Sequence, residues 1–193
     1  MKPLAAEDFL SKTDYEAARD EIRRRILVLK ERRRVLLGDH CSVHFETRET
    51  LRYQVHEMLR AENSWERPGA LEDELTAYNP LVPGGRELSA TVMFEYETPE
   101  ERAVKLAELV GIDRHLWLVI GSETPIAAEF DRMQLSDGKI SSVQFVRWPV
   151  DPFRRDLLQE EGTVVKIVCD HPHYRAQSVL SEQARKEIAS DLD

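Results

Sequence analysis

The chain has 193 residues, of which 41% are hydrophobic and 33% charged, and its formal net charge is −9 at pH 7. This composition is typical of a globular protein with one substantial core, and it excludes fibrous and disordered chains. No stretch approaches the roughly 20 apolar residues that a membrane span needs, and acids stand where a signal peptide would carry its apolar run. We therefore expect a single cytosolic (cytoplasmic) domain over residues 1–193. Two cysteines, Cys41 and Cys169, are too few for a disulfide scaffold and fit a reducing compartment.

Positive charge is concentrated between Arg19 and Arg34. Eight bases stand there against three acids, a local charge of +5, so the rest of the chain carries −14. An acidic body repels a nucleic-acid backbone. We therefore expect this segment to bind acidic protein surface, its own or a partner's, and not nucleic acid.

One long helix and one strand are predicted near the start of the chain. Thr13–Glu16 has the pattern of a capping box and Gly38 is a typical left-handed stop, so the helix should occupy residues 14–37 with its arginines pointing outward. Residues 41–46 then alternate in the manner of a half-buried strand. Its two faces would carry Cys41, Val43 and Phe45 on one side and Ser42, His44 and Glu46 on the other.

Two shorter helical patterns follow. Residues 50–62 have helical spacing, although Leu51, Tyr53 and Val55 also alternate as in a strand, so both alternatives stay open at this point. Residues 71–78 form the next helical pattern, which ends at an Asn-Pro pair.

The second half of the chain is rich in strands. Residues 88–96 alternate cleanly, which predicts a strand with one buried and one solvent-exposed face. The whole pattern gives about seven strands and six helices without strict βαβ alternation, and so predicts an α+β fold with a mainly antiparallel or mixed sheet. The other expected strands are residues 115–120, 125–130, 141–148, 163–169 and 174–180, and the other helices begin after Thr98, Asp151 and Ser181.

Histidine and cysteine gather in two short windows, His40–His44 and Cys169–His173, whereas the common phosphate-loop, dinucleotide-binding, serine-hydrolase and zinc-peptidase motifs are absent. Imidazole and thiolate are ligands that zinc and iron prefer, so a transition-metal site is one interpretation. The other is that the histidines cap strands and the cysteines pack as small apolar groups, since Cys41 on a strand faces away from its neighbouring histidines. The candidate metal ligands are His40, His44, His171 and His173.

Charged and amide side chains are dense between Glu46 and Glu62. If residues 50–62 form a helix, Gln54, Glu57 and Arg60 share one face, which places an acid, a base and an amide side by side. One interpretation is an ion pair on a wet surface, and the other is a site for an anion or a substrate. The candidate binding residues of the whole chain are His40, Glu46, Arg48, Gln54, Glu57, Arg60, Glu62 and His171.

Five motifs of the chain form a recognisable set. They are Gly38-Asp39-His40, Phe45-Glu46-x-Arg48-x-Thr50, Gln54-x-x-Glu57-Met58-Leu59-Arg60-Ala61-Glu62, Glu87-Leu88-Ser89-Ala90-Thr91 and Asp170-His171-Pro172-x-Tyr174. In these motifs, and over nearly its whole length, the chain resembles a bacterial family known as domain of unknown function 3501. The family has no assigned activity. The resemblance implies a genomic context beside rubrerythrin and an iron–sulfur oxidoreductase, which are the partners it suggests.

Two functions from different classes follow. The first is an accessory or binding protein of a bacterial redox or peroxide-defence system, which binds a partner protein or a small anion through residues 46–62; it rests mainly on the resemblance. The second is a small-molecule enzyme, with or without a metal, in which His171 is the acid/base and Glu57 or Glu46 its carboxylate partner. An active site requires these side chains to converge in one concave pocket, whereas a partner-binding face does not.

Of the two histidines around Pro172, His171 is expected to be the functional one. A proline restricts the backbone of the residue before it, so the imidazole of His171 should be held in few directions. We expect it in an exposed loop between two strands. The alternative is that Asp170 and His171 only build a tight turn.

Overall fold

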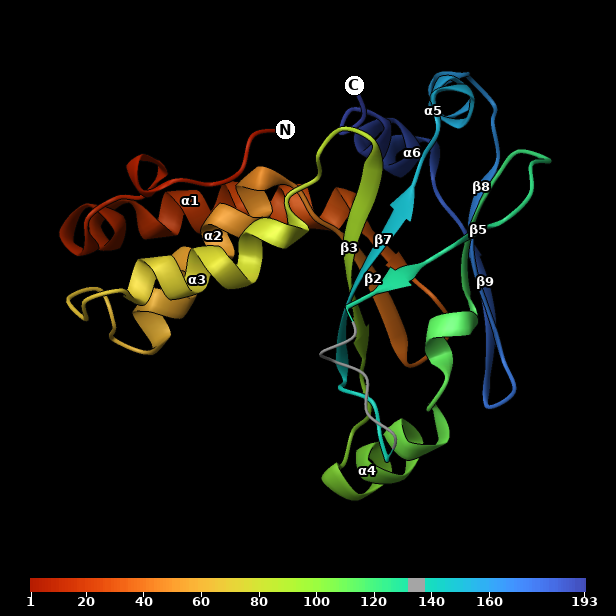
Figure 1. Cartoon of the computed structure of the whole chain (residues 1–193), viewed down its shortest axis with the longest axis horizontal. Coiled ribbons are helices and arrows are strands. Elements are labelled where there is room, and N and C mark those ends of the chain that lie inside the picture. The colour runs from red at the N-terminus through yellow and green to blue at the C-terminus, as the bar shows by residue number, and fades with distance from the viewer. Residues whose placement is uncertain (132–137) are drawn as a thin grey trace.

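The computed structural model describes residues 1–131 and 138–193. Over these residues the chain forms six α-helices and two antiparallel sheets, which confirms the expected α+β class and the long N-terminal helix. Figure 1 shows the first three helices as an arm that extends from one side of the sheets, with the remaining helices at the two ends of the sheets.

The helical arm consists of α1 (Lys12–Arg32), α2 (Arg48–Ala61) and α3 (Ala70–Tyr78). At the start of α2 the Thr47 hydroxyl accepts the Thr50 N–H, and the Thr50 hydroxyl accepts the Thr47 N–H. This reciprocal cap satisfies two backbone donors at the helix end. The segment is therefore a helix, and the alternative of a strand is wrong.

The long helix is shorter than the sequence predicts. α1 ends at Arg32, and Arg34–Leu36 forms strand β1, which pairs with β2 (Cys41–Phe45). The side chain of Arg33, between α1 and β1, is only 2% exposed, so the expectation that the arginines all point outward is wrong. Helix propensity is a weak prior, and here a buried ion pair of Arg33 and the β1–β2 hydrogen bonds override it.

One sheet, which we call sheet A, lies next to the helical arm. It has the strand order β1-β2-β3-β7-β6, and its central pairs are β2 with β3 and β3 with β7. The bounds of the last three strands are β3 (Glu87–Phe94), β6 (Glu129–Phe130) and β7 (Val143–Pro149).

The second sheet, sheet B, has the order β5-β4-β8-β9. Residues 125–130 do not form the single strand that the sequence predicts, because the chain crosses between the sheets at the buried Ala128: β5 pairs with β4 in sheet B, and β6 pairs with β7 in sheet A. This division contributes to a total of nine strands in the described residues, where about seven are predicted. The strands of sheet B are β4 (Leu116–Ile120), β5 (Ile126–Ala127), β8 (Val165–His171) and β9 (Tyr174–Val179).

The two faces of sheet A are both covered. Cys41, Val43 and Phe45 lie in the main core, which sheet A shares with sheet B, as the alternation predicts. The opposite face of β3 is predicted to be solvent-exposed, yet Ser89 and Thr91 on it are buried. The helical arm covers this face, and the sequence of the strand alone could not reveal that neighbour.

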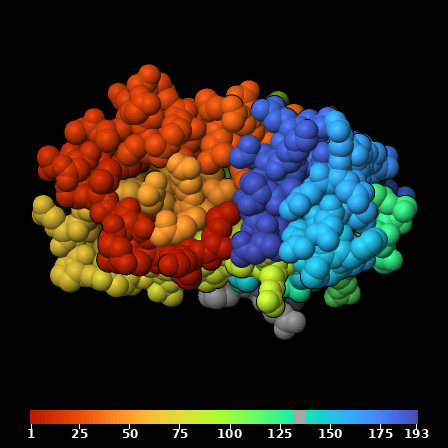
Figure 2. All heavy atoms as spheres, turned by 90° about the horizontal axis from the view of Figure 1, so that it is seen from above, coloured from red at the N-terminus to blue at the C-terminus, as the bar shows by residue number. Residues whose placement is uncertain are grey.

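Three capped helices close the two ends of the sheets: α4 (Pro99–Glu108), α5 (Pro152–Gln159) and α6 (Glu182–Ala189). Their caps are the predicted ones, since the side chains of Thr98, Asp151 and Ser181 each accept a backbone N–H three residues later. Figure 2 shows the C-terminal segment with α6, in dark blue, next to the N-terminal segment, in red.

Within the described residues, no helix is long and apolar enough to cross a membrane. Cys41 and Cys169 are free and buried in the core.

Candidate functional site

A cleft of about 660 Å³ lies between the helical arm and sheet A, two parts of the fold whose ribbons meet in Figure 1. This volume is within the range of small-molecule sites in proteins. Its walls come from α1, α2, α3 and four strands of sheet A (β1, β2, β3 and β7), and they combine an apolar surface with a few polar groups. The apolar lining is Leu27, Leu51, Met93, Val143 and Phe145, and the polar lining is Lys30, Glu31, Arg34, His44, Glu46, Gln54, Tyr78 and Thr91.

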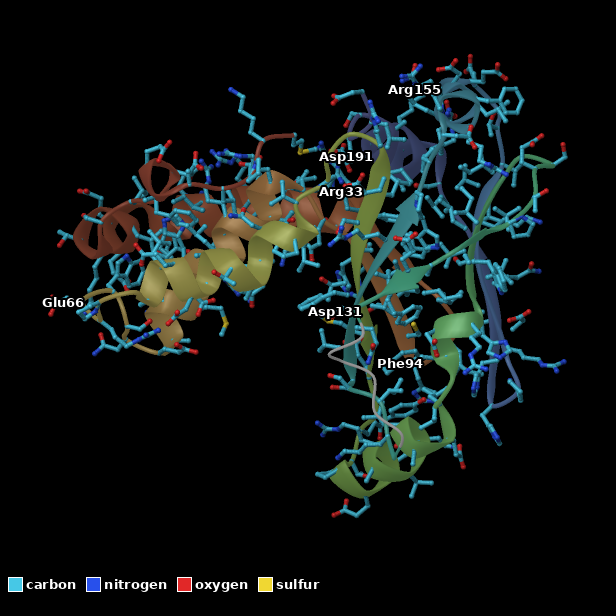
Figure 3. The ribbon with its side chains drawn as sticks, in the orientation of Figure 1. Arg33, Glu66, Phe94, Asp131, Arg155 and Asp191 are labelled. Carbon is cyan, nitrogen blue, oxygen red and sulfur yellow. The ribbon has the colours of Figure 1, made fainter. Side chains whose placement is uncertain are left out.

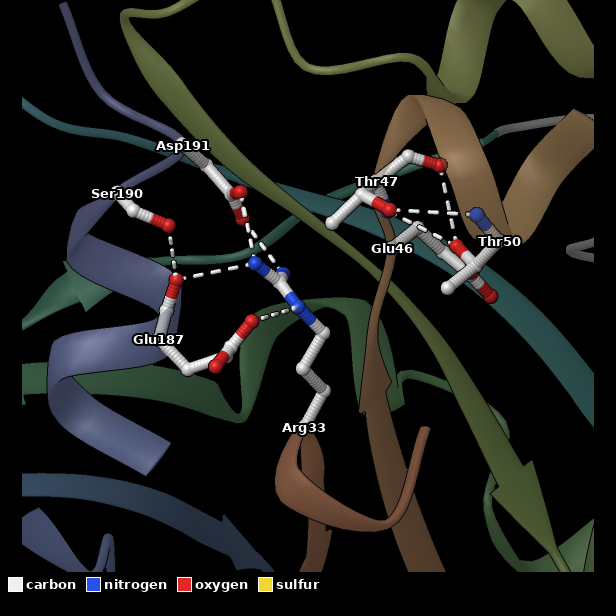
Figure 4. Close-up of polar contacts among 7 residues, drawn as sticks. All are labelled: Arg33, Glu46, Thr47, Thr50, Glu187, Ser190 and Asp191. Atoms are coloured by element: carbon white, nitrogen blue, oxygen red, sulfur yellow. Dashed lines mark hydrogen bonds and ion pairs between the residues drawn. The ribbon is translucent and has the colours of Figure 1, made fainter. Parts of the chain in front are cut away.

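Glu46 is a buried carboxylate in this cleft, only 7% exposed. One oxygen accepts the Thr50 hydroxyl at 2.5 Å, as Figure 4 shows, and the other accepts the Thr91 hydroxyl at 2.7 Å. Among the described residues no lysine or arginine forms an ion pair with it. The N-terminus of α2, which begins two residues later, favours a negative group at this place. A carboxylate has about four lone-pair sites, so Glu46 keeps acceptor capacity for a group in the cleft.

His44 precedes Glu46 by two residues on the same face of β2, and it also lines the cleft. Its Nε2 lies 3.0 Å from the hydroxyl oxygen of Ser42, and that hydroxyl donates to the carboxylate of Glu95 at 3.0 Å. Burial lowers the pKa of His44 from its ordinary value of 6.5, although the charge of Glu46 opposes the shift. The imidazole is therefore neutral at pH 7.

Gln54 and Tyr78 close the cleft on the side of α2 and α3. Both residues contribute to the lining of the cleft. Burial raises the pKa of Tyr78, so its hydroxyl stays protonated and offers a hydrogen-bond donor at neutral pH.

Glu57 and Arg60, which the sequence places beside Gln54, lie outside the cleft and do not pair with each other. Glu57 accepts two hydrogen bonds from the Arg19 guanidinium, at 2.8 and 2.9 Å, and one from the Tyr15 hydroxyl at 2.7 Å. The Arg19 guanidinium is the main cause that lowers the pKa of Glu57 to about 2. Arg60 binds Glu16 at 2.9 Å. The predicted ion pair within α2 is therefore wrong: both charges join α2 to α1.

Three further candidates have contacts of their own away from the cleft. Arg48 binds Asp8 and the Lys2 carbonyl, and so fastens the N-terminal segment to α2. Glu62 is exposed at the C-terminal end of α2. His40 stacks on Tyr96 with ring centroids 4.9 Å apart, in the loop between β1 and β2.

The second histidine window lies in sheet B, on the far side of sheet A from the cleft. His171 ends β8 and is 4% exposed, so the expectation of an exposed loop is wrong for this residue. Its Nδ1 accepts the His173 N–H at 3.3 Å, and its Nε2 lies 3.2 Å from the Val110 carbonyl. Burial lowers the pKa of His171 below 6.5. These contacts favour the turn-building role, because both ring nitrogens are occupied by backbone groups.

The four histidines proposed as metal ligands are dispersed. His40 stacks on Tyr96 and His44 contacts Ser42, while His171 ends β8 and His173 lies in the turn that leads to β9. Over the described part of the chain, no three His, Cys, Asp or Glu side chains form a group that could hold a metal ion.

The basic segment of the chain is largely paired with acids of the same chain. The most buried of these pairs joins Arg33 to Asp191 near the C-terminus by two hydrogen bonds, 2.7 and 2.8 Å long (Figures 3 and 4). Reasoning from the sequence missed this pair, since 157 residues separate its partners. The other pairs are Arg19 with Glu57, Arg24 with Glu21, Arg25 with Glu49 and Arg34 with Glu95.

The cleft therefore gathers two of the eight predicted binding residues, Glu46 and Gln54, together with His44 from the metal candidates. Thr91 and Tyr78 were missed as site residues. The alternation of β2 and β3 could have indicated Thr91, because it faces the same side of sheet A as His44, its register partner. No local signal indicated Tyr78.

Together the fold and the cleft define an α+β protein whose helical arm and two-sheet body enclose a small-molecule-sized site. The family model described as Protein of unknown function (DUF3501) matches residues 3–192, and the chain belongs to this family. It is also similar to a crystal structure of a novel protein of unknown function from Burkholderia pseudomallei, with 35% identity, 100% of both chains covered and a TM-score of 0.92. No curated protein matches the chain.

Proposed function

We propose that the protein binds a small molecule in the cleft between the helical arm and sheet A, and that Glu46 holds a cationic or hydrogen-bond-donating group of that molecule. The observation that carries the proposal is a buried carboxylate that has two hydroxyl donors and, among the described residues, no ion pair with a lysine or an arginine, although Lys30 and Arg34 also line the cleft. An ammonium group would satisfy its remaining lone pairs by charge-assisted hydrogen bonds.

The remaining walls favour an apolar body on the same molecule. Leu51, Val143 and Phe145 contribute apolar surface beside the polar groups, and burial of such surface is worth about 25 cal/mol per Å². The other charged residues of the lining, Lys30, Glu31 and Arg34, are of both signs. Glu46 is therefore the residue that should select a ligand with a cationic or hydrogen-bond-donating group.

The role of this binding in the cell is proposed from the family resemblance alone. It is that of an accessory protein in a bacterial redox or peroxide-defence system of the cytoplasm, with a rubrerythrin or an iron–sulfur oxidoreductase as partner. The alternative of an enzyme that joins His171 to Glu46 or Glu57 has no support in the geometry, because sheet A separates His171 from both carboxylates.

Benzylamine is a suitable first probe, because it has an ammonium head and an apolar ring. In isothermal titration calorimetry we expect saturable one-site binding that weakens at least about tenfold in Glu46→Gln, since a hydrogen bond to a charged group is worth about 1.5–3 kcal/mol. Benzoate, which carries the opposite charge on a similar ring, should bind more weakly than benzylamine.

The matched control is Glu66→Gln, an exposed glutamate near the far end of the helical arm (Figure 3). It should bind benzylamine as the wild type does. Equal affinities of the wild type and Glu46→Gln, with both proteins folded by circular dichroism, would show that Glu46 only supports the start of α2.

A further inference from the structure

A continuous hydrogen-bonded chain leads from the cleft to solvent through β2. It consists of His44, whose ring lines the cleft, Ser42, which is fully buried, and Glu95, whose side chain is 57% exposed. The two links are each 3.0 Å long. An imidazole, a hydroxyl and a carboxylate in this order are the groups that pass protons between them.

The contacts define which nitrogen of His44 carries the proton. The single Ser42 proton is donated to the Glu95 carboxylate, so the Ser42 oxygen can only accept from the ring. His44 must therefore donate from Nε2–H, and in the neutral ring Nδ1 then has a free lone pair. Within the described residues, Nδ1 has no hydrogen-bond partner.

We propose that the cleft is an acid–base site in which His44 accepts a proton at Nδ1 from the bound molecule and Ser42 and Glu95 relay a proton to solvent. The proposal rests on the proposed binding function, because the molecule must first be held in the cleft. Two residues of an extended strand span roughly 7 Å, so Glu46 can hold the head of a small molecule while His44 reaches its body.

The proton and electron balance needs no second reactant. A C–H, N–H or O–H bond of the bound molecule breaks, its electron pair stays on that molecule, and an Nδ1–H bond forms on His44. His44 then gives its Nε2 proton to Ser42, which gives its own proton to Glu95, and Glu95 releases a proton to water. Return of the proton to another atom of the molecule would make the overall reaction an isomerisation.

The charged groups around His44 come from several elements. Glu46 and Glu95 favour its protonated form, while Lys30 and Arg34 oppose it. Glu31 and Tyr78 line the same cleft. Burial outweighs the two carboxylates, and so leaves the ring as a neutral base at pH 7.

The base-promoted ring opening of 5-nitrobenzisoxazole tests the proposal with the whole chain. In that reaction a base removes the C–H proton, the electron pair forms a nitrile, and the N–O bond breaks to release a coloured phenolate. We expect a saturable rate that rises with pH around a midpoint below 6.5. His44→Asn should lower kcat at least about a hundredfold, and Ser42→Ala and Glu95→Gln about tenfold at unchanged KM.

The relay has its own readout, because Glu95→Gln removes a charge that favours protonated His44 and should move the midpoint of the pH profile down. His115→Asn, at a half-buried histidine that is bound to Asp170 in sheet B, away from the cleft, should match the wild type. ¹⁵N NMR of wild-type His44 should show the Nε2–H form; the Nδ1–H form, or an unchanged kcat in His44→Asn, would overturn the acid–base site. Unchanged kinetics in both Ser42→Ala and Glu95→Gln would overturn the relay.

Loss of benzylamine binding in Glu46→Gln is measured separately, so a failure of the binding proposal is distinguishable from a failure of the acid–base proposal.

Discussion

At the scale of single residues, buried polar groups of this protein have specific partners that determine their role. Glu57 is held by Arg19 and Tyr15 between two helices, whereas Glu46 has only hydroxyl donors and opens on the cleft. Two carboxylates eleven residues apart therefore serve different purposes: one joins helices and the other is available to a ligand. The same reasoning separates His171, whose nitrogens are both occupied, from His44, which has a free one.

His171 gives the clearest test at this scale. His171→Asn should lower the free energy of unfolding by about 1–3 kcal/mol, because the shorter side chain can replace Nδ1 but leaves the Val110 carbonyl without its ring donor. Urea denaturation monitored by circular dichroism measures the change. The neighbouring His173→Asn, at an exposed position, should change stability by less than about 0.5 kcal/mol. Equal stabilities of the two variants would contradict the turn-building role.

At the scale of elements, the helical arm is attached to the body by a buried ion pair. Arg33 follows α1 directly, and Asp191 follows α6, so the pair joins the base of the arm to the C-terminal end of the chain (Figure 3). A second contact, from the Arg33 guanidinium to the Glu187 carbonyl at 3.0 Å, satisfies another donor. The cleft lies at this same junction, so its shape depends on the attachment.

Asp191→Asn should destabilise the protein by about 3 kcal/mol, because it removes the buried counter-ion of Arg33 and leaves only the part-exposed carboxylate of Glu187, 3.6 Å from the Arg33 Nε. Thermal and urea unfolding measure the loss. Asp156→Asn breaks an exposed arginine pair on α5 and should cost less than about 1 kcal/mol. Equal losses in the two variants would mean that the buried pair does not hold the arm. The double variant Arg33→Met with Asp191→Leu should recover much of the loss, because no buried charge is left unpaired.

At the scale of the whole molecule, neutral histidines lie in three separate places, where His56 and His171 are buried and His44 is half-buried. His44 faces the cleft, His56 stacks on Tyr15 in the arm with ring centroids 4.3 Å apart, and His171 closes a hairpin of sheet B. Burial is the first cause that lowers the pKa of each of them below 6.5. In His56 and His171 one ring nitrogen accepts a backbone N–H, which a protonated ring could not do.

The stability of the fold should therefore fall as the pH drops from 7 to 5. The unfolded chain binds protons at these histidines from about pH 6.5 downward, whereas the folded chain binds them only at lower pH. Each histidine therefore lowers the free energy of unfolding by at most about 1.4 kcal/mol for each pH unit. Glu57 adds to the loss only at lower pH, between its ordinary pKa of 4.5 and about 2. Urea midpoints at pH 7, 6 and 5 measure the effect. His173→Gln, which removes an exposed histidine, should keep the same pH dependence, and equal midpoints at pH 7 and 5 would contradict the explanation.

The sequence by itself determined what depends on near neighbours in the chain. The alternation of residues 41–46 located the core face of β2, and the caps at Thr98, Asp151 and Ser181 located three helix starts. The segment from Glu46 to Glu62 contained three residues of the cleft, Glu46, Leu51 and Gln54. These features follow from side-chain periodicity and from hydrogen bonds over three residues, which any local window contains.

Only the tertiary structure decided which charged groups pair and where the cleft forms. Arg33 pairs with Asp191, and Glu57 with Arg19 instead of Arg60, because partners are selected by proximity in space and not by spacing along one helix. Contacts with segments that are distant in the sequence also end α1 at Arg32 and cover the face of β3 that the sequence predicts to be solvent-exposed. The cleft needs α1, α2, α3 and sheet A at once. No single segment encodes the cleft, since its walls come from segments that are distant from one another in the sequence.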